Sequence, residues 1–352
     1  MKSWDVVIAG GGIVGISLAR ELRRHGASVL VVERGEPGRE ASHAAAGMLA
    51  WCDPMLPQPL KPIARASAEM YAEFVQEVED ESGMRVDLRT DGTVVYSEQD
   101  AASYVSAGQW RPLAAEDIAR LEPRLEYPGQ AAYWTPEASV DPRALIAASV
   151  KAAKHRGIDI VSGSAVTAVE LDGNRAVAVT TAKTRYAAGK VVNCCGAWAG
   201  QVPPLAFPTR PIKGQMLCVV AARGLLHHIV RAADVYIVPR SDGRNLIGST
   251  LEDAGFDKRV DPETIQCLHQ AATSLVPHLG EARMLETWAG LRPGTPDALP
   301  LLGGTEVANC FVAAGHYRDG ILLAPLTAVV MSQVVRGLQP DFDLSAFSPA
   351  RF

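Results

Sequence analysis

The amino-acid sequence predicts an α/β fold with two domains whose segments alternate along the chain. Near the N-terminus a strand, a glycine-rich turn, a helix and a second strand follow one another, as in a parallel sheet covered by helices. A second strand, glycine turn and helix stand near the C-terminus, and the strand patterns between them are typical of an antiparallel sheet. At 352 residues the chain is also longer than one typical domain.

The N-terminal unit is predicted from three apolar patterns. Residues 6–9 are apolar without alternation, which indicates a strand buried on both faces. The pattern from Ile13 to Leu22 has the period of a helix, and 28–32 predicts a second buried strand. These elements follow one another in the order of a parallel βαβ unit.

Gly10, Gly12 and Gly15 stand between the first strand and the helix. Gly10 permits a tight turn, Gly12 lets the backbone approach a pyrophosphate, and Gly15 lets the helix pack against the strand. Glu33 ends the second strand, where an acid would bind ribose hydroxyls. An ordinary glycine turn would not need this order of elements, so we predict a Rossmann-like dinucleotide-binding domain.

Composition narrows the class of protein. An apolar fraction of 48% with 21% charged residues is typical of a soluble globular protein, and a net charge of −5 argues against nucleic acid as the main partner. The six cysteines show no metal-ligand spacing, so we expect reduced thiols, no metal and a cytoplasmic location. Asp5 argues against a signal peptide, and 321–331 is too short for a transmembrane segment.

The remaining elements are predicted from periodicity and turn residues. A hairpin is expected at 86–97, around Asp91 and Gly92, and prolines between 54 and 62 mark departure from the first domain. Helices are predicted at 64–81, 113–121, 143–156, 262–275 and 321–336. Further strands are predicted at 159–161, 165–171, 176–181, 190–193, 214–221, 235–238, 246–249, 285–291 and 310–314.

Two further stretches point to a flat, two-ended ligand. Residues 41–48 are mostly alanine and glycine, which lets the backbone lie close to such a ligand, although a plain helix start is an alternative. The turn at 315–320 leads into the C-terminal helix, whose positive end would face the ligand and could stabilise negative charge on it. The N-terminal turn would then hold a pyrophosphate and the C-terminal turn the other ring system.

Five motifs in one order resemble the flavin-dependent D-amino acid oxidase superfamily, and its glycine oxidase branch most closely. They cover nearly the whole chain, at 10–15 (GGGIVG), 44–49 (AAAGML), 236–240 (YIVPR), 288–295 (WAGLRPGT) and 314–325 (AGHYRDGILLAP). The resemblance implies a Rossmann-like FAD-binding domain at 1–50, 142–200 and 285–352. An interleaved, antiparallel-sheet α+β substrate domain would take 51–141 and 201–284.

The resemblance also implies FAD held without a covalent bond. A covalent link through His43 is an alternative, because some relatives attach FAD to a histidine in a similar loop, but here the loop is one residue longer. The cofactor residues expected from the fingerprint and the resemblance are Gly10, Gly12, Ile13, Val14, Gly15, Glu33, Arg34, Ala41, Ser42, Ala46, Gly47, Met48, Val166, Gly196, His316, Tyr317, Arg318, Asp319, Gly320, Ile321 and Leu322.

The family's substrate residues match Arg292, Arg318 and Tyr236, which we take as catalytic and substrate-binding, with Met48 beside them. Arginine suits an α-carboxylate because its planar fork donates two parallel hydrogen bonds. Each residue also has a structural interpretation. Arg292 could pair with Asp297, Arg318 could pair with Asp319 or orient the turn, and Tyr236 could simply pack in a strand.

The implied reaction is hydride transfer from Cα of glycine or a similar small amino acid to flavin N5. Water would hydrolyse the imine to a keto acid and ammonia, and O2 would be reduced to H2O2, in a step of thiamine precursor synthesis. Asp234 and Leu251 depart from the glycine oxidase pattern, so a dehydrogenase or oxidase of sarcosine-like, D-amino or imino acids is an alternative. An NAD-dependent reductase, a non-catalytic flavin subunit and a homo-oligomer also stay open.

Overall fold

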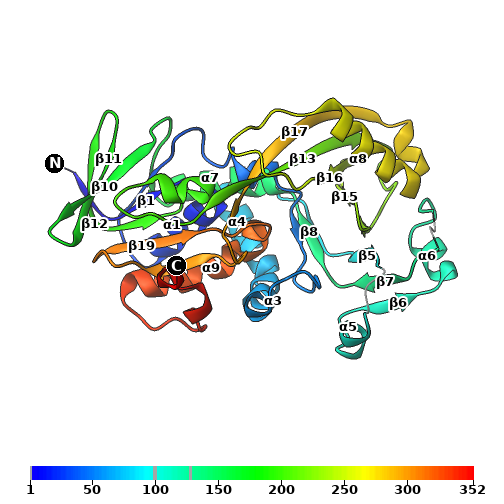
Figure 1. Cartoon of the computed structure of the whole chain (residues 1–352), viewed down its shortest axis with the longest axis horizontal. Helices are drawn as coiled ribbons and strands as arrows, with labels where there is room; N and C mark the ends of the chain where they lie inside the picture. The colour runs from blue at the N-terminus through cyan, green and yellow to red at the C-terminus, as the bar shows by residue number, and fades with distance from the viewer. Residues whose placement is uncertain (1, 98–100, 127–128) are drawn as a thin grey trace.

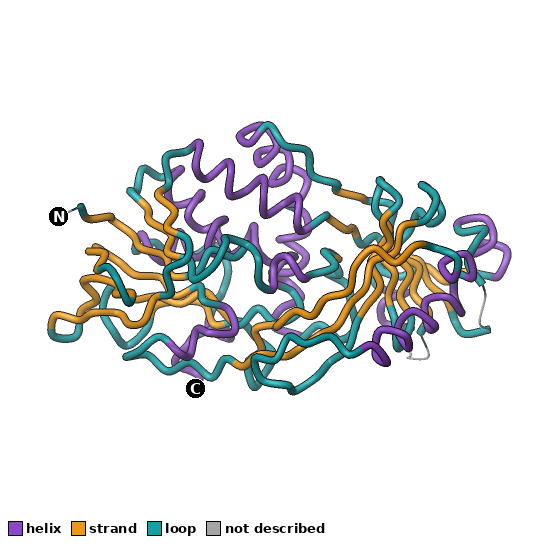
Figure 2. Tube along the Cα trace, turned by 90° about the horizontal axis from the view of Figure 1, so that it is seen from above, coloured by secondary structure: helices purple, strands orange, loops and turns teal. Residues whose placement is uncertain are grey.

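The computed structural model of the chain describes residues 2–97, 101–126 and 129–352. Two large sheets lie toward opposite ends of the molecule, and the N-terminus lies beside the first of them (Figure 1). Figure 2 shows a group of helices between the first sheet and the middle of the molecule. No helix of the described residues is long and apolar enough to cross a membrane.

The first sheet is built around β1 (Ser3–Ala9), as the apolar run predicts. It lies between β2 (Val29–Val32) and β12 (Arg185–Asn193), and both pairings are parallel. β9 (Asp159–Val161) and β19 (Cys310–Ala314) continue the parallel pairing on the two sides. Antiparallel strands complete the sheet, namely β10 (Val166–Asp172), β11 (Arg175–Thr181) and β18 (Leu301–Gly304).

Parallel pairing brings the carboxyl ends of these strands to one edge, where ligands of open α/β sheets bind. Gly10 follows β1, Glu33 follows β2, Gly196 follows β12 and Gly315 follows β19. Residues that are far apart in sequence therefore meet at this edge.

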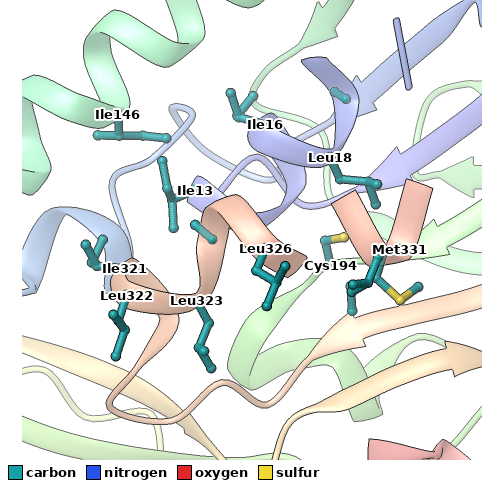
Figure 3. Close-up of a cluster of buried hydrophobic side chains, with 14 of the residues drawn as sticks. Ile13, Ile16, Leu18, Ile146, Cys194, Ile321, Leu322, Leu323, Leu326 and Met331 are labelled. Atoms are coloured by element: carbon teal, nitrogen blue, oxygen red, sulfur yellow. The ribbon is translucent and has the colours of Figure 1, made fainter. Parts of the chain in front are cut away.

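A buried cluster joins the first and last helices. α1 (Ile13–Arg24) packs against α9 (Gly320–Arg336), with Leu18 and Met331 in the same core (Figure 3). Each fully buried side chain of this size contributes about 2 kcal/mol through the hydrophobic effect. The cluster fixes the start of α9 relative to the turn at Gly10.

α9 contains Pro325, which has no N–H to donate to the carbonyl of Ile321. The hydroxyl of Tyr71 donates to that carbonyl, and the Ser67 hydroxyl donates to the carbonyl of Leu322 at 2.7 Å. Both donors come from a pair of helices, α3 (Lys61–Glu69) and α4 (Tyr71–Ser82). These contacts preserve the first turn of α9 beside the ligand-binding edge.

The second sheet is antiparallel except for the parallel pair β14 and β5, so the predicted antiparallel sheet is largely confirmed. The predicted boundary at 285 falls inside β17, which pairs with β13 along its length, and the division into domains stays a proposal. In sheet order the strands are β17 (Arg283–Gly294), β13 (Arg210–Val220), β16 (Arg244–Gly248), β15 (Tyr236–Pro239), β14 (Ile229–Arg231), β5 (Thr93–Tyr96), β7 (Ala132–Thr135) and β6 (Arg111–Leu113).

The other helices and short strands surround these two sheets. α7 carries the predicted N-cap, since the Asp141 carboxylate accepts hydrogen bonds from the N–H groups of Arg143 and Ala144. The elements are α2 (Ala41–Ala44), α5 (Ala102–Ser106), α6 (Ala115–Leu121), α7 (Pro142–His155), α8 (Pro262–Leu275), β3 (Met48–Leu49), β4 (Leu88–Arg89) and β8 (Ala138–Val140), with short 3-10 turns at Gln58–Leu60, Gly196–Gln201, Pro277–Gly280, Ser345–Phe347 and Pro349–Arg351.

The hairpin predicted at 86–97 is wrong. β4 pairs with β8, whereas β5 pairs with β7 and β14, so the two strands belong to different sheets. A Cβ at Gly92 would lie 2.4 Å from Nε1 of Trp134, so this glycine allows a close side-chain approach rather than a hairpin turn. The helix predicted at 64–81 is divided in two at Met70.

We expect Gly15→Ala to lower the free energy of unfolding by about 2 kcal/mol or more, because an added Cβ would lie 2.1 Å from the carbonyl oxygen of Gly10. The control Gly304→Ala places its Cβ at an ordinary 3.9 Å from the Phe311 ring. Urea unfolding of both variants measures the difference. Equal destabilisation would show that the close approach at Gly15 is not required.

Candidate active site

A cavity of about 830 Å³ lies at the carboxyl-end edge of the first sheet and extends to the inner face of the second. Both sheets contribute lining residues, including Gly10 from one and Tyr236 from the other. A cavity of this size matches those that hold cofactors and small ligands. The predicted cofactor residues that line it are Gly10, Gly12, Ile13, Val14, Glu33, Arg34, Ala41, Ser42, Ala46, Gly47, Met48, Val166, Gly196, His316, Tyr317, Arg318, Asp319, Gly320 and Ile321.

The dinucleotide end of the cavity is shaped by backbone contacts. A Cβ at Gly10 would lie 2.3 Å from the carbonyl oxygen of Cys194, so only glycine fits this turn. The Glu33 carboxylate accepts hydrogen bonds from the N–H groups of Gly11 at 2.7 Å and Gly35 at 2.9 Å. It is therefore fixed where an acid could meet a ribose.

Two predicted cofactor residues, and the histidine considered for a covalent flavin link, lie outside the cavity lining. Gly15 packs against the Gly10 carbonyl, and Leu322 belongs to the core cluster of Figure 3, so neither is among the described lining residues. His43 also lies outside that lining, with Nε2 at 2.9 Å from Nη1 of Arg39. The cavity therefore does not favour a covalent flavin through His43.

The turn before α9 carries two groups with shifted pKa values. Burial lowers the pKa of His316 to about 4, and its Nε2 lies 3.2 Å from the Thr327 hydroxyl, so the ring is uncharged at neutral pH. Burial raises the pKa of Asp319 to about 7, although Arg318 opposes the shift. Arg318 itself pairs with Asp53 at 3.7 Å and not with Asp319, contrary to the structural alternative.

Arg292 is held in the cavity by uncharged oxygens. Its Nη2 donates to the Ser249 hydroxyl at 2.6 Å, and its Nη1 donates to the carbonyls of Thr250 at 3.1 Å and Lys213 at 3.4 Å. In the described part of the chain it has no ion pair. A half-buried guanidinium without a carboxylate is a strong candidate site for an anion.

Two observations explain how Arg292 reaches this position. Asp297, its suggested partner, binds Arg351 at 2.8 Å instead. A Cβ at Gly214 would lie 2.3 Å from Nη1 of Arg292, so the glycine on the neighbouring strand makes room for the guanidinium. The sequence contains this glycine, but only the register between β13 and β17 shows what it faces.

Tyr236 lies across from Gly248 on the neighbouring strand. A Cβ at Gly248 would lie 2.7 Å from the tyrosine oxygen, so the ring lies over this glycine, beside Ser249. Among the described residues, the hydroxyl donates only to the sulfur of Met216, at 3.7 Å. It is thus able to donate a stronger hydrogen bond to a ligand.

Sequence reasoning missed the roles of three residues, Asp53, Arg231 and Arg240. Asp53 and Arg231 line the cavity, as do Asp234 and Leu251, the two departures from the family pattern noted above. Arg240 is 2% exposed and donates to the Ala46 carbonyl, which ties β15 to the small-residue loop. In the sequence, an arginine stands at the end of β14 and another directly after β15, and a charged residue at the end of an apolar strand could have drawn attention to both.

Comparison with known proteins decides the family. A model described as FAD dependent oxidoreductase matches residues 5–334. The chain belongs to this family. It is therefore an FAD-dependent oxidoreductase, and the resemblance and the fold class predicted from the sequence are confirmed.

Relatives of this oxidoreductase match along nearly its whole length. Glycine oxidase of Pseudomonas aeruginosa is 34% identical and covers 98% of both chains. The bifunctional protein ThiO/ThiG of a Synechocystis species is 35% identical over 99% of this chain, which spans 54% of that protein's length. The crystal structure of glycine oxidase from Geobacillus kaustophilus superposes with a TM-score of 0.95, 32% identity and full coverage of both chains.

His316 gives a pH-dependent stability with a defined sign. Its pKa falls from 6.5 to about 4 on folding, so its contribution is complete above about pH 6.5 and is lost as the pH falls toward 4. We expect a loss of about 3 kcal/mol across this window that is missing in His316→Gln. Urea unfolding at several pH values tests this, and parallel curves for the two proteins would contradict it.

Proposed function

We propose that this enzyme oxidises glycine or a similar small amino acid, giving an imine that water hydrolyses to a keto acid and ammonia. The keto acid from glycine would be glyoxylate, and O2 would be reduced to H2O2. The observation that carries the proposal is Arg292, a guanidinium in the cavity with no acid partner among the described residues. The glycine oxidase names of full-length relatives support the same reaction.

The residues of the first sheet's edge fit FAD. The turn at Gly10 leaves no room for a Cβ, and the Glu33 carboxylate is fixed beside it. These residues would hold the pyrophosphate and a ribose, while Ala46, Gly47 and the turn at His316 would lie against the ring system. When bound, FAD supplies the acceptor for the two electrons and the Cα hydrogen.

The chain's own task is to bind and orient the substrate. Arg292 would hold the α-carboxylate with two parallel hydrogen bonds, and Tyr236 would donate a third. Oxidation of a neutral amine needs no strong protein base, which agrees with a His316 ring that is buried and bonded to Thr327. Arg318 would close the other side of the substrate.

A second candidate has a specific observation in its favour. Asp234 and Leu251, which depart from the glycine oxidase pattern, both line the cavity. Sarcosine-like, D-amino or imino acids are therefore alternative substrates of the same site, with an acceptor other than O2 as a further alternative. The cytoplasmic location and the oligomeric state stay predictions from the sequence.

An anaerobic titration tests the proposed function. The visible spectrum of the purified protein is recorded during addition of glycine, sarcosine, D-alanine or D-proline, and air is then admitted. Bleaching of the flavin bands, with recovery and peroxide in air, supports the proposal and ranks the substrates. Bound flavin that none of these acids bleaches would contradict it, and recovery only with a dye would indicate a dehydrogenase.

We expect Arg292→Met to lower kcat/KM for the best substrate by about 100-fold or more, because the charge-assisted bonds to the carboxylate are lost. Gly214→Ala keeps every polar group but places a Cβ 2.3 Å from Nη1 of Arg292, so it should lower kcat/KM as well. Steady-state kinetics on FAD-saturated protein measure both. Unchanged kinetics in either variant would contradict the assigned role.

A further inference from the structure

A loop of the second sheet reaches the dinucleotide end of the cavity. We name residues 253–260, between β16 and α8, the strap. Phe256 of the strap stacks on Trp198, with the ring centroids 5.0 Å apart and 29° between the ring planes. Nζ of Lys258 lies 3.0 Å from Oε2 of Glu40. Trp198 and Glu40 line the cavity and follow strands of the first sheet, so the strap joins the two sheets beside the cavity.

Both ends of the strap are held on β13. Glu252 and Lys213 exchange two backbone hydrogen bonds, at 2.9 Å and 3.0 Å. The Glu252 carboxylate also accepts from the side-chain amide of Gln215 at 2.9 Å and lies 3.1 Å from Nζ of Lys213. At the other end, Oε1 of Gln215 accepts from the N–H of Asp261 at 2.7 Å. The two ends are therefore fixed on one strand, while the middle of the strap extends to the first sheet.

The contacts in the middle of the strap are exposed. Phe256 is 40% exposed although its ring is stacked, and the side chain of Lys258 is 45% exposed. Asp257 and Arg259, the two neighbours of Lys258, pair with each other at 2.7 Å, within the strap. Exposed contacts of this kind are individually weak, so separation of the strap from the first sheet costs far less free energy than unfolding of the core.

Both contacts of the strap lead to Arg34. The Arg34 guanidinium lies over the Trp198 ring, 4.0 Å from its centroid, so Phe256, Trp198 and Arg34 form one series of contacts. Nη2 of Arg34 also lies 3.9 Å from Oε1 of Glu40, the partner of Lys258. Arg34 lines the cavity directly after Glu33, the acid at the ribose position of the fingerprint. The strap is thus connected to the residues that would meet the nucleotide part of FAD.

We propose that the strap retains FAD. It fixes Trp198 and Arg34 at the dinucleotide end of the cavity, so that release of the cofactor requires the strap to open. Phe256 and Lys258 are then positioning residues for FAD, although neither is among the described lining residues. The inference needs only that the enzyme binds FAD and does not depend on which substrate it oxidises. If the strap only packed the two sheets together, its loss would not change the rate of FAD release.

The first test removes the stacked ring. We expect Phe256→Ala to release FAD about tenfold faster than the wild type, because the aromatic contact that holds Trp198 is lost. Release is followed by the fluorescence of free FAD after dilution of the holoenzyme. The matched control is Phe352→Ala, which removes a 52% exposed ring beside Arg351, outside the described cavity lining. Unchanged release from Phe256→Ala, or equal acceleration in the control, would overturn the inference.

The second test removes the ion pair with a control for net charge. Lys258→Met should release FAD about threefold faster at low salt, and the difference should vanish in about 1 M salt, which screens exposed charges. Arg259→Met removes the same charge from the same loop but breaks only the pair with Asp257, so it should release FAD as the wild type does. Equal acceleration in the two variants would assign the effect to net charge and contradict the inference.

Amide hydrogen exchange of the wild type needs no variant. We expect the amides of the strap to exchange about tenfold more slowly in the FAD-loaded protein than in the protein stripped of FAD, because a bound cofactor favours the closed strap. The exposed turn at 182–184, between β11 and β12 and outside the described cavity lining, should exchange equally in both. Equal exchange of the strap with and without FAD would overturn the inference, whatever substrates the enzyme oxidises.

Discussion

The guanidinium of Arg292 lies in the cavity, and among the described residues it donates hydrogen bonds to hydroxyl and carbonyl oxygens and to no carboxylate. A positive charge that is kept away from water costs free energy unless an anion pairs with it. The surrounding residues must therefore hold the guanidinium in place. Gly214 supplies the space, and the register of β13 with β17 sets the two residues side by side. The second sheet thus acts as a frame for one positive charge.

The first sheet brings the other half of the site to the same place. Parallel strands end at one edge, so the turns after β1 and β19 meet although they lie near opposite ends of the sequence. The Arg240 side chain then ties β15 to the Ala46 carbonyl, and burial lowers its pKa to about 10. This buried contact holds the second sheet against the small-residue loop of the cavity.

Local patterns predicted the elements whose causes are local. The βαβ unit around Gly10, the helix capped by Asp141 and the helix ending at Arg336 are confirmed. The hairpin at Asp91 and Gly92 failed because strand partners are chosen by distant segments. Arg231 was missed for the same reason. Its position in the cavity follows from its pairing with Tyr236 in the sheet and its contact with Asp53, and no sequence spacing reveals either. The roles of the site residues stay predictions.

The central claim is that the cavity selects a carboxylate through Arg292. Titration of the FAD-loaded protein with acetate and with acetamide, followed by the flavin absorption spectrum, tests it directly because the two molecules differ in charge but hardly in shape. The account predicts that acetate perturbs the spectrum in a saturable way and that acetamide does so only at much higher concentration. Equal binding of the two would show that the cavity does not recognise the charge, and would contradict the account.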